Sequence, residues 1–270
     1  MAIITISRGS YSKGKEVAEK VAQKLGYECI SREVLMEASE HFNIPEIKLV
    51  RALHDAPRVL ERFTYGKEKY LAFIEAAILE RLRRDNVVYH GLAGHFFLKG
   101  IDHVLKVRIL AQIEDRIRLE MERENISREE ALYILKKDDH ERRQWSLKLY
   151  GRDTWDSSLY DLVIHIHRIT ADDAVDIICR TAQSEHFRTT PESQKAIDEL
   201  VLAARVKALL IDRCPSVRVR VREGVAYVDT QAGPGIAEQL AEELKELAEK
   251  APGVKDVKID ISPASAYFSD

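Results

Sequence analysis

The stretch IITISRGSYSKGKE, residues 3–16, joins an apolar run of strand length to a loop containing glycine and lysine. Four residues separate Gly9 from Gly14, and Lys15 follows, which is nearly the spacing of a phosphate-binding loop. In such loops backbone N–H groups converge on anionic oxygens, a helix N-terminus lies behind them, and the lysine reaches the terminal phosphates. The stretch predicts a nucleotide phosphate site. The alternative is a plain turn from a strand into a helix.

Other side chains of this loop are expected at the bound nucleotide, namely Ser10, Ser12, Lys13 and Glu16. Glu16 stands where the standard motif has a magnesium-binding Ser or Thr. A carboxylate cannot donate a hydrogen bond to a phosphate. We therefore expect Mg²⁺ to be held through the phosphates, water or another carboxylate.

The composition predicts a cytoplasmic globular protein. Hydrophobic residues make up 45% and charged residues 32% of the 270 residues, and a net charge of −3 gives no general attraction to nucleic acid or anionic lipid. The sequence contains no apolar run of about 18 residues, so we expect no membrane span. Its N-terminus has no basic segment followed by an apolar one, so we expect no export signal. Cys29, Cys179 and Cys214 are far apart, which favours reduced structural thiols over a disulfide frame or a zinc site.

Apolar strands alternate with helical segments through the first two thirds of the chain. The strands are expected at residues 2–6, 28–30, 87–89, 104–110 and 162–166. The helices are expected at 14–25, 33–41, 45–64 (broken), 66–84, 113–124, 127–150 and 171–182. Such alternation predicts an α/β fold with a five-stranded parallel sheet covered by helices on both faces. Ligands of these folds bind at the carboxyl ends of the strands, which is where the loop at Gly9 would lie.

The pattern changes after a polar segment at residues 184–194, which is interpreted as a linker. Residues 195–263 predict a small α+β domain with the order helix, strand, strand, helix, strand. The first domain would then be 1–183 and the tail 264–270. Two candidate sites have ordinary alternatives: His165 and His167 as a metal pair or a plain strand end, and the Arg218, Arg220 and Arg222 row as an anion-binding or merely solvated face.

Residues 3–180 resemble the cytidylate kinase-like family of P-loop nucleoside monophosphate kinases. The resemblance rests on five stretches: ITISRGSYSKGKEVAEKVAQKLGY, NVVYHGLAGHFFL, VRILAQIEDRIRLEMERENISREEAL, KKDDHERRQWSLKLYGRDTW and YDLVIHI. The family's loop resembles S-R-E-x-G-S-G-G-R-E, so a glutamate at position 16 is normal there. The resemblance implies ATP as donor, Mg²⁺, and transfer of the γ-phosphoryl group to a nucleoside monophosphate, typically CMP or dCMP.

The resemblance also implies roles for single residues. Lys15 falls on the basic residue that contacts the β- and γ-phosphates, and Arg142, followed by Arg143, falls on the arginine of the lid. Arg116 falls where related kinases place an arginine against the adenine or the phosphates. Such arginines would neutralise charge on the transferring group.

The acceptor side departs from the family's pattern. The family tends to have an acidic residue after the second strand, where this chain has Ser31 and Arg32. After the third strand it resembles G-R-G, where this chain has His90, glycine and leucine, so the arginine is missing. Residues expected to contact the acceptor are Ser31, Arg32, Arg58, Arg62 and His90.

The C-terminal unit resembles a BON domain, on the stretches AARVKALLIDRCPSVRVRVREGVAYVDTQ and AEQLAEELKELAEKAPGVKDVKIDI. That family is associated with binding phospholipid or other ligands and with protein contacts, and it carries no catalytic residues. Two hypotheses about function therefore stand. The first is a kinase acting on CMP or a similar small acceptor. The second is a nucleotide-binding regulatory protein with little turnover, which signals through the second domain.

Overall fold

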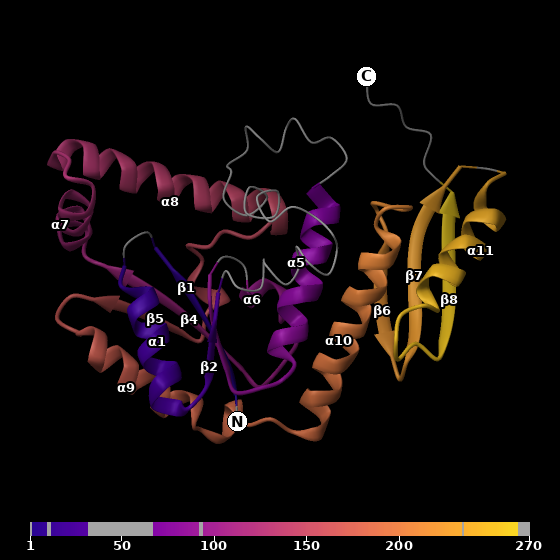
Figure 1. Cartoon of the computed structure of the whole chain (residues 1–270), viewed down its shortest axis with the longest axis horizontal. Coiled ribbons are helices and arrows are strands. Elements are labelled where there is room, and N and C mark those ends of the chain that lie inside the picture. The colour runs from indigo at the N-terminus through magenta and orange to yellow at the C-terminus, as the bar shows by residue number, and fades with distance from the viewer. Residues whose placement is uncertain (1, 10–11, 32–66, 92–93, 234, 264–270) are drawn as a thin grey trace.

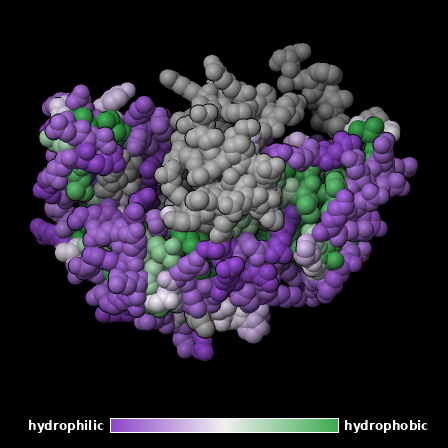
Figure 2. Space-filling model, in the orientation of Figure 1, coloured by the Kyte–Doolittle hydropathy of each residue, from purple (hydrophilic) through white to green (hydrophobic). Residues whose placement is uncertain are grey.

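The computed structural model describes residues 2–9, 12–31, 67–91, 94–233 and 235–263. Its two sheets have different architectures, one parallel with five strands and one mixed with three (Figure 1). The predicted helices at 33–41 and 45–64 lie outside the described residues. No helix of the described ranges is long and apolar enough to cross a membrane, and hydrophilic residues dominate the face in Figure 2.

The larger sheet confirms the predicted α/β fold. Its strands are β1 Ile3–Arg8, β2 Glu28–Ile30, β3 Val87–His90, β4 Val104–Ala111 and β5 Leu162–Ile166. They are all parallel, in the order β2-β3-β1-β4-β5. Because β1 is central, the loop that follows it begins in the middle of the sheet's carboxyl edge, where ligands of such folds bind.

Helices cover both faces of this sheet (Figure 1). Helices α1 (Gly14–Leu25) and α9 (Ala171–Ala182) pack on one face over a core of Ile, Val and Leu side chains. The opposite face carries α5 (Lys67–Leu82) and the short α6 (Gly94–Phe97). Helices α7 (Ile113–Glu124) and α8 (Arg128–Tyr150) pack together, and α8 crosses the carboxyl edge.

Two helix starts follow the sequence signals. Ser127 accepts a hydrogen bond from the Glu130 amide and forms a complete capping box with it, which confirms the predicted start of α8. Thr170 makes the same arrangement with Asp173 at α9. The four-residue α6 was not predicted, because so short a segment has no helical periodicity to read.

The C-terminal unit confirms the predicted order of elements. It consists of α10 Pro191–Leu210, β6 Arg218–Arg222, β7 Val225–Ala232, α11 Ala237–Ala248 and β8 Asp256–Pro263. Helix α10 starts earlier than expected, inside the segment interpreted as a linker. Thr190 caps it together with Ser193, and Pro191 occupies the first turn, where a missing N–H is harmless.

Helices α5 and α10 lie antiparallel, joined by ion pairs along their length. Arg83 pairs with Asp198 at 2.7 Å, Glu75 with Lys207 at 2.9 Å, Lys69 with Asp212 at 2.7 Å, and Glu80 with Arg205 at 2.9 Å. One buried apolar cluster runs from the face of the large sheet through α5 and α10 into the small sheet. Helix α5 is therefore buried on two sides rather than on one.

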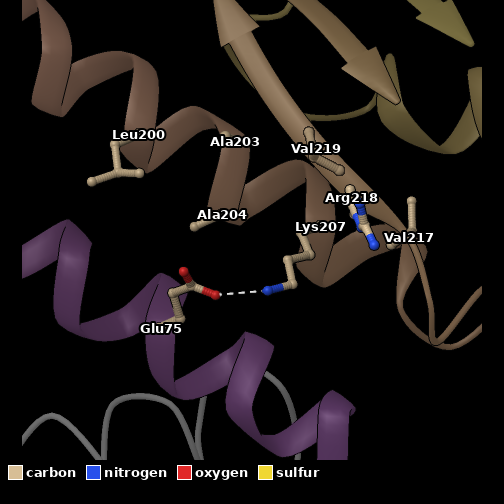
Figure 3. A pocket seen from close by; sticks show the side chains of 8 residues that line it. All are labelled: Glu75, Leu200, Ala203, Ala204, Lys207, Val217, Arg218 and Val219. Atoms are coloured by element: carbon tan, nitrogen blue, oxygen red, sulfur yellow. Dashed lines mark hydrogen bonds and ion pairs between the residues drawn. The ribbon is translucent and has the colours of Figure 1, made fainter. Parts of the chain in front are cut away.

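A pocket of about 210 Å³ lies at this junction, lined by residues of α5, α10 and β6 (Figure 3). The Glu75–Lys207 ion pair crosses it, and Arg218 lies at the side of β6. Its lining belongs to the junction of the two units and includes no residue of the loop after β1.

Candidate functional site

The described part of the loop between β1 and α1 is held close to β4. The Gly9 amide donates to the Ile109 carbonyl at 3.2 Å. The Ser12 hydroxyl lies 3.0 Å from the Gly9 carbonyl and 3.1 Å from the Ile109 carbonyl, and its side chain is buried. Since a hydroxyl has one proton to donate, this proton is directed at the protein backbone. Ser12 therefore shapes the loop, which differs from the phosphate donation expected of it.

Lys13 and Gly14 turn the chain into α1. Lys13 is the N-cap and has left-handed φ of 60° and ψ of 10°, a conformation that favours glycine. At Gly14 a Cβ would lie 2.7 Å from the Cβ of Arg8, so only glycine allows the helix to start this close to the end of β1. The family's loop pattern has glycine at both positions, and this chain keeps only the second.

The N-terminus of α1 lacks a side-chain cap from its N-cap residue. Lys13 makes no such hydrogen bond, and the first helical bond along the chain runs from the Val17 amide to the Lys13 carbonyl. The amides of the first turn and the positive end of the helix dipole therefore face outward at the carboxyl edge. The Lys15 ammonium lies 3.6 Å from Glu19, with 64% of its side chain exposed, and Glu16 pairs with Lys20 at 2.9 Å.

Arg116 of α7 comes to the same place. A Cβ on Gly9 would lie 4.0 Å from its guanidinium and 4.0 Å from a carboxylate oxygen of Asp139. Arg116 donates to Asp139 of α8 at 2.8 Å, and their side chains are 11% and 23% exposed. The structure thus brings the predicted Arg116 beside the predicted Gly9, while Asp139 was missed because it reads as one of several charges on a helix.

The two neighbouring arginines of α8 have different surroundings. Arg143 makes a bidentate contact with Asp153, with nitrogen–oxygen distances of 2.6–3.0 Å, and stacks 4.6 Å above the centre of the Trp155 ring. The Arg143 guanidinium holds the pKa of Asp153 below its usual value. Its engagement favours a structural role over the predicted catalytic one. Arg142 is half-buried and makes no ion pair or hydrogen bond with any other residue in the described ranges.

The acceptor side is described in part. His90 ends β3 opposite Ile6 of β1 and is buried. Ser31 directly follows β2, so both residues stand at the carboxyl edge. Ser10, Arg32, Arg58 and Arg62, the other predicted contacts, lie outside the described residues.

Sequence reasoning missed a group on the sheet face next to α6. Arg108 of β4 is 7% exposed, and its Nη1 donates to the Tyr160 hydroxyl at 3.1 Å and approaches the Ser7 hydroxyl at 3.4 Å. The ring of the buried His95 lies 5.0 Å from the Tyr160 ring. Burial, and secondarily the Arg108 charge, lowers the pKa of His95 to about 3, so His95 is neutral at ordinary pH. A charge inside an apolar strand was the only available signal for Arg108.

The start of α1 and Arg116 fit the phosphates of a nucleotide. The uncapped start of α1 and Arg116 supply amides and positive charge for phosphates. Within the described residues no three His, Cys, Asp or Glu side chains gather as a metal site, His165 and His167 included.

Comparison with known proteins agrees with this geometry. A cytidylate kinase from Ignicoccus hospitalis is 29% identical over 184 residues, covering 67% of this chain and 98% of the relative. One from Sulfolobus acidocaldarius is 24% identical over 176 residues, covering 65% and 91%. The crystal structure of an uncharacterized protein from Eubacterium ventriosum shares the fold, with a TM-score of 0.53 and 22% identity over 68% of this chain and all of that one. The cytidylate kinase-like family matches residues 3–168, more than half of the sequence. The chain belongs to the cytidylate kinase-like family.

Proposed function

We propose that this protein is an ATP- and Mg²⁺-dependent kinase that transfers the γ-phosphoryl group to a nucleoside monophosphate, with CMP or dCMP as the first candidates. The observation that carries the proposal is the uncapped N-terminus of α1 behind Gly9 and Gly14, with Arg116 beside the loop. Both relatives described above are named cytidylate kinases, which supports the choice of acceptor.

Different groups of the site bind the donor phosphates and the transferring phosphoryl group. The amides of the first turn of α1 bind the donor phosphates, and Lys15 reaches the terminal ones. To do so Lys15 leaves Glu19, which costs little because an exposed ion pair of this kind contributes about 0–1 kcal/mol. Arg142 neutralises charge that develops on the transferring group, since phosphoryl transfer depends mainly on positioning and electrostatics.

The C-terminal unit is proposed as a BON-like accessory domain of residues 195–263 that binds a small ligand or a protein, with 1–183 as the kinase domain. The parts share a buried apolar cluster and the α5–α10 ion pairs. This contact supports the second hypothesis, a nucleotide-binding regulator with little turnover. A conformational change in one unit could reach the other through the side chains packed between α5 and α10.

One experiment separates the two functions. The full chain is purified and supplied with ATP, Mg²⁺ and a panel of nucleoside monophosphates, and ADP release is measured. We expect release that depends on CMP or dCMP, with a loss of about 100-fold or more in Lys15→Ala. Glu19→Ala removes the partner of Lys15 and serves as the matched control, with activity within about twofold of the wild type. Saturable ATP binding without turnover on any acceptor would favour the regulator.

A further inference from the structure

We propose that Arg108 is the cation that binds the phosphate of the acceptor, in place of the arginine that this chain lacks after β3. The inference rests on the proposed kinase function and adds a residue that the family's motifs do not assign. It is carried by the burial of Arg108, by the neutral character of its partners, and by its position at the carboxyl edge of the sheet.

Arg108 is a buried cation whose hydrogen bonds among the described residues go to two hydroxyls. It is 7% exposed, and it forms no ion pair with a carboxylate in the part of the chain that the structure describes. A guanidinium is charged at all ordinary pH values and has five N–H donors. Burying such a charge without a carboxylate in contact with it is costly, so its retention favours an anionic partner.

The contacts of Arg108 leave most of its guanidinium available. Only Nη1 has hydrogen-bond partners among the described residues, namely the Tyr160 and Ser7 hydroxyls. The guanidinium carbon lies 5.5 Å from the centre of the Tyr160 ring, and the Tyr160 hydroxyl also lies 3.1 Å from the Thr154 carbonyl. Tyr160 is thus fixed from a second side and supports the guanidinium, and the Nε and Nη2 protons remain for a ligand.

The position of Arg108 matches the acceptor side of the edge. Ser7 lies opposite Arg108 in the pairing of β1 with β4, two residues before Gly9 of the phosphate loop. On the other side of β1, β3 ends at His90, opposite Ile6. The Arg108 guanidinium reaches back toward β1 at Ser7, one residue beyond that end. It therefore lies at the Ser7 end of β1, one strand away from β3, and we infer that from there it takes the place of the arginine missing after β3.

A planar guanidinium is suited to a phosphate, since two parallel N–H groups can bind two phosphate oxygens. Two neighbours bear on this. His95 is neutral, so it adds no positive charge that would compete for an anion. The hydrogen bonds of the Asp153 carboxylate go to Arg143 and to the Trp155 amide, and they lower its pKa. The Arg108 charge contributes less to that lowered pKa. A purely structural Arg108 would instead hold Tyr160 to β1 and would be indifferent to phosphate.

The test compares CMP with cytidine, which differ by the phosphate alone. Equilibrium binding of CMP, cytidine and ATP is measured by calorimetry on the full-length wild type, Arg108→Met, Arg108→Lys and Arg180→Met. The last variant is the matched control, because Arg180 is exposed on α9, which covers the opposite face of the sheet. KM for CMP and kcat are measured on the same samples.

We expect Arg108→Met to weaken CMP binding by about 30-fold or more, while cytidine and ATP binding stay within about threefold. The CMP affinity of Arg108→Lys should lie between those of the wild type and Arg108→Met, because lysine keeps the positive charge and loses the paired N–H donors of the guanidinium. KM for CMP should rise more than kcat falls, and Arg180→Met should behave as wild type. An unchanged ratio of CMP to cytidine affinity in Arg108→Met overturns the inference, as does a wild type that binds cytidine as well as CMP.

The outcomes for the two proposals are distinguishable. If CMP binding depends on Arg108 but no turnover occurs, the kinase function is contradicted and the phosphate contact of Arg108 is supported. If turnover occurs and is insensitive to Arg108, the kinase function is supported and the phosphate contact is contradicted. If Arg108→Met fails to fold, Arg108→Lys decides, since an unchanged CMP-to-cytidine ratio in that variant also overturns the inference.

Discussion

Arg116 of α7 donates to Asp139 of α8 at 2.8 Å, and this pair lies beside Gly9 in the loop that follows β1. A residue proposed to bind the nucleotide is thus held by a carboxylate of the neighbouring helix before any phosphate arrives. The carboxylate stabilises the packing of α7 on α8. It also places negative charge next to a proposed phosphate site, so its two effects can be separated by substitution.

Asp139→Asn should lower the free energy of unfolding by about 1–3 kcal/mol, because it replaces one partner of a largely buried, charge-assisted contact. The same change should tighten ATP binding several-fold, since it removes a charge that repels phosphates. Urea unfolding and calorimetry measure the two quantities. Asp115→Asn, which breaks an exposed pair with Arg118, is the control and should change stability by less than about 0.5 kcal/mol. Weaker ATP binding in Asp139→Asn would show that the carboxylate positions Arg116 instead.

Lys13→Gly should leave the loop intact and raise the free energy of unfolding by up to about 1 kcal/mol. The left-handed conformation of Lys13 costs a non-glycine residue about 1–2 kcal/mol, and the extra chain entropy of glycine offsets part of that gain. Phosphoryl transfer should stay within about threefold. Asn125→Gly is a matched comparison, because Asn125 has a φ of 53° but tolerates this region better, so its gain should be smaller. A collapse of activity in Lys13→Gly would assign its side chain to catalysis.

Arg142→Met and Arg143→Met should have opposite signatures. Arg143 is fixed by Asp153 and Trp155, so its replacement should lower the urea midpoint of unfolding slightly, with little change in kcat. Arg142 has no such contacts among the described residues, and its replacement should lower kcat by about 100-fold or more at unchanged stability. Asp153→Asn should reproduce the effect of Arg143→Met. Equal losses of kcat in both arginine variants would contradict the assignment.

His95→Gln should flatten the dependence of stability on pH. The pKa of His95 is about 3 in the folded chain, against an ordinary value near 6.5. Below pH 6.5 the unfolded chain therefore binds the extra proton, and folded stability falls as the pH is lowered toward 3. Between pH 7 and pH 5 the wild type should lose about 2 kcal/mol more than His95→Gln in urea unfolding. Parallel curves for the two proteins would contradict the prediction.

Much of the fold could be predicted because its signals are local. The helix after β1 runs from Gly14 to Leu25 as expected, with Gly26 in the left-handed region at its end, and Ser127 starts α8 through contacts three residues away. Pro191 misled the interpretation, because a proline suits both a linker and the first turn of a helix.

The candidate site was less predictable, because its decisive contacts are distant in sequence. Arg116 and Asp139 are separated by a helix and a turn, and the Arg108–Tyr160 contact joins residues 52 positions apart. The spacing of basic residues identifies candidates such as Arg142 and Arg143. It does not tell which guanidinium a carboxylate already engages, since Asp153 meets Arg143 only after the chain has turned at Gly151.

Helix α5, which directly follows the segment where Arg58 and Arg62 are predicted to meet the acceptor, is buried on its other side by α10. Once a kinase has acquired an apolar helix face of this kind, deleting the extension exposes it and favours aggregation. The C-terminal unit is then an addition that is not easily lost, because it covers this face. Relatives that lack such a unit should carry polar residues on the equivalent face of this helix.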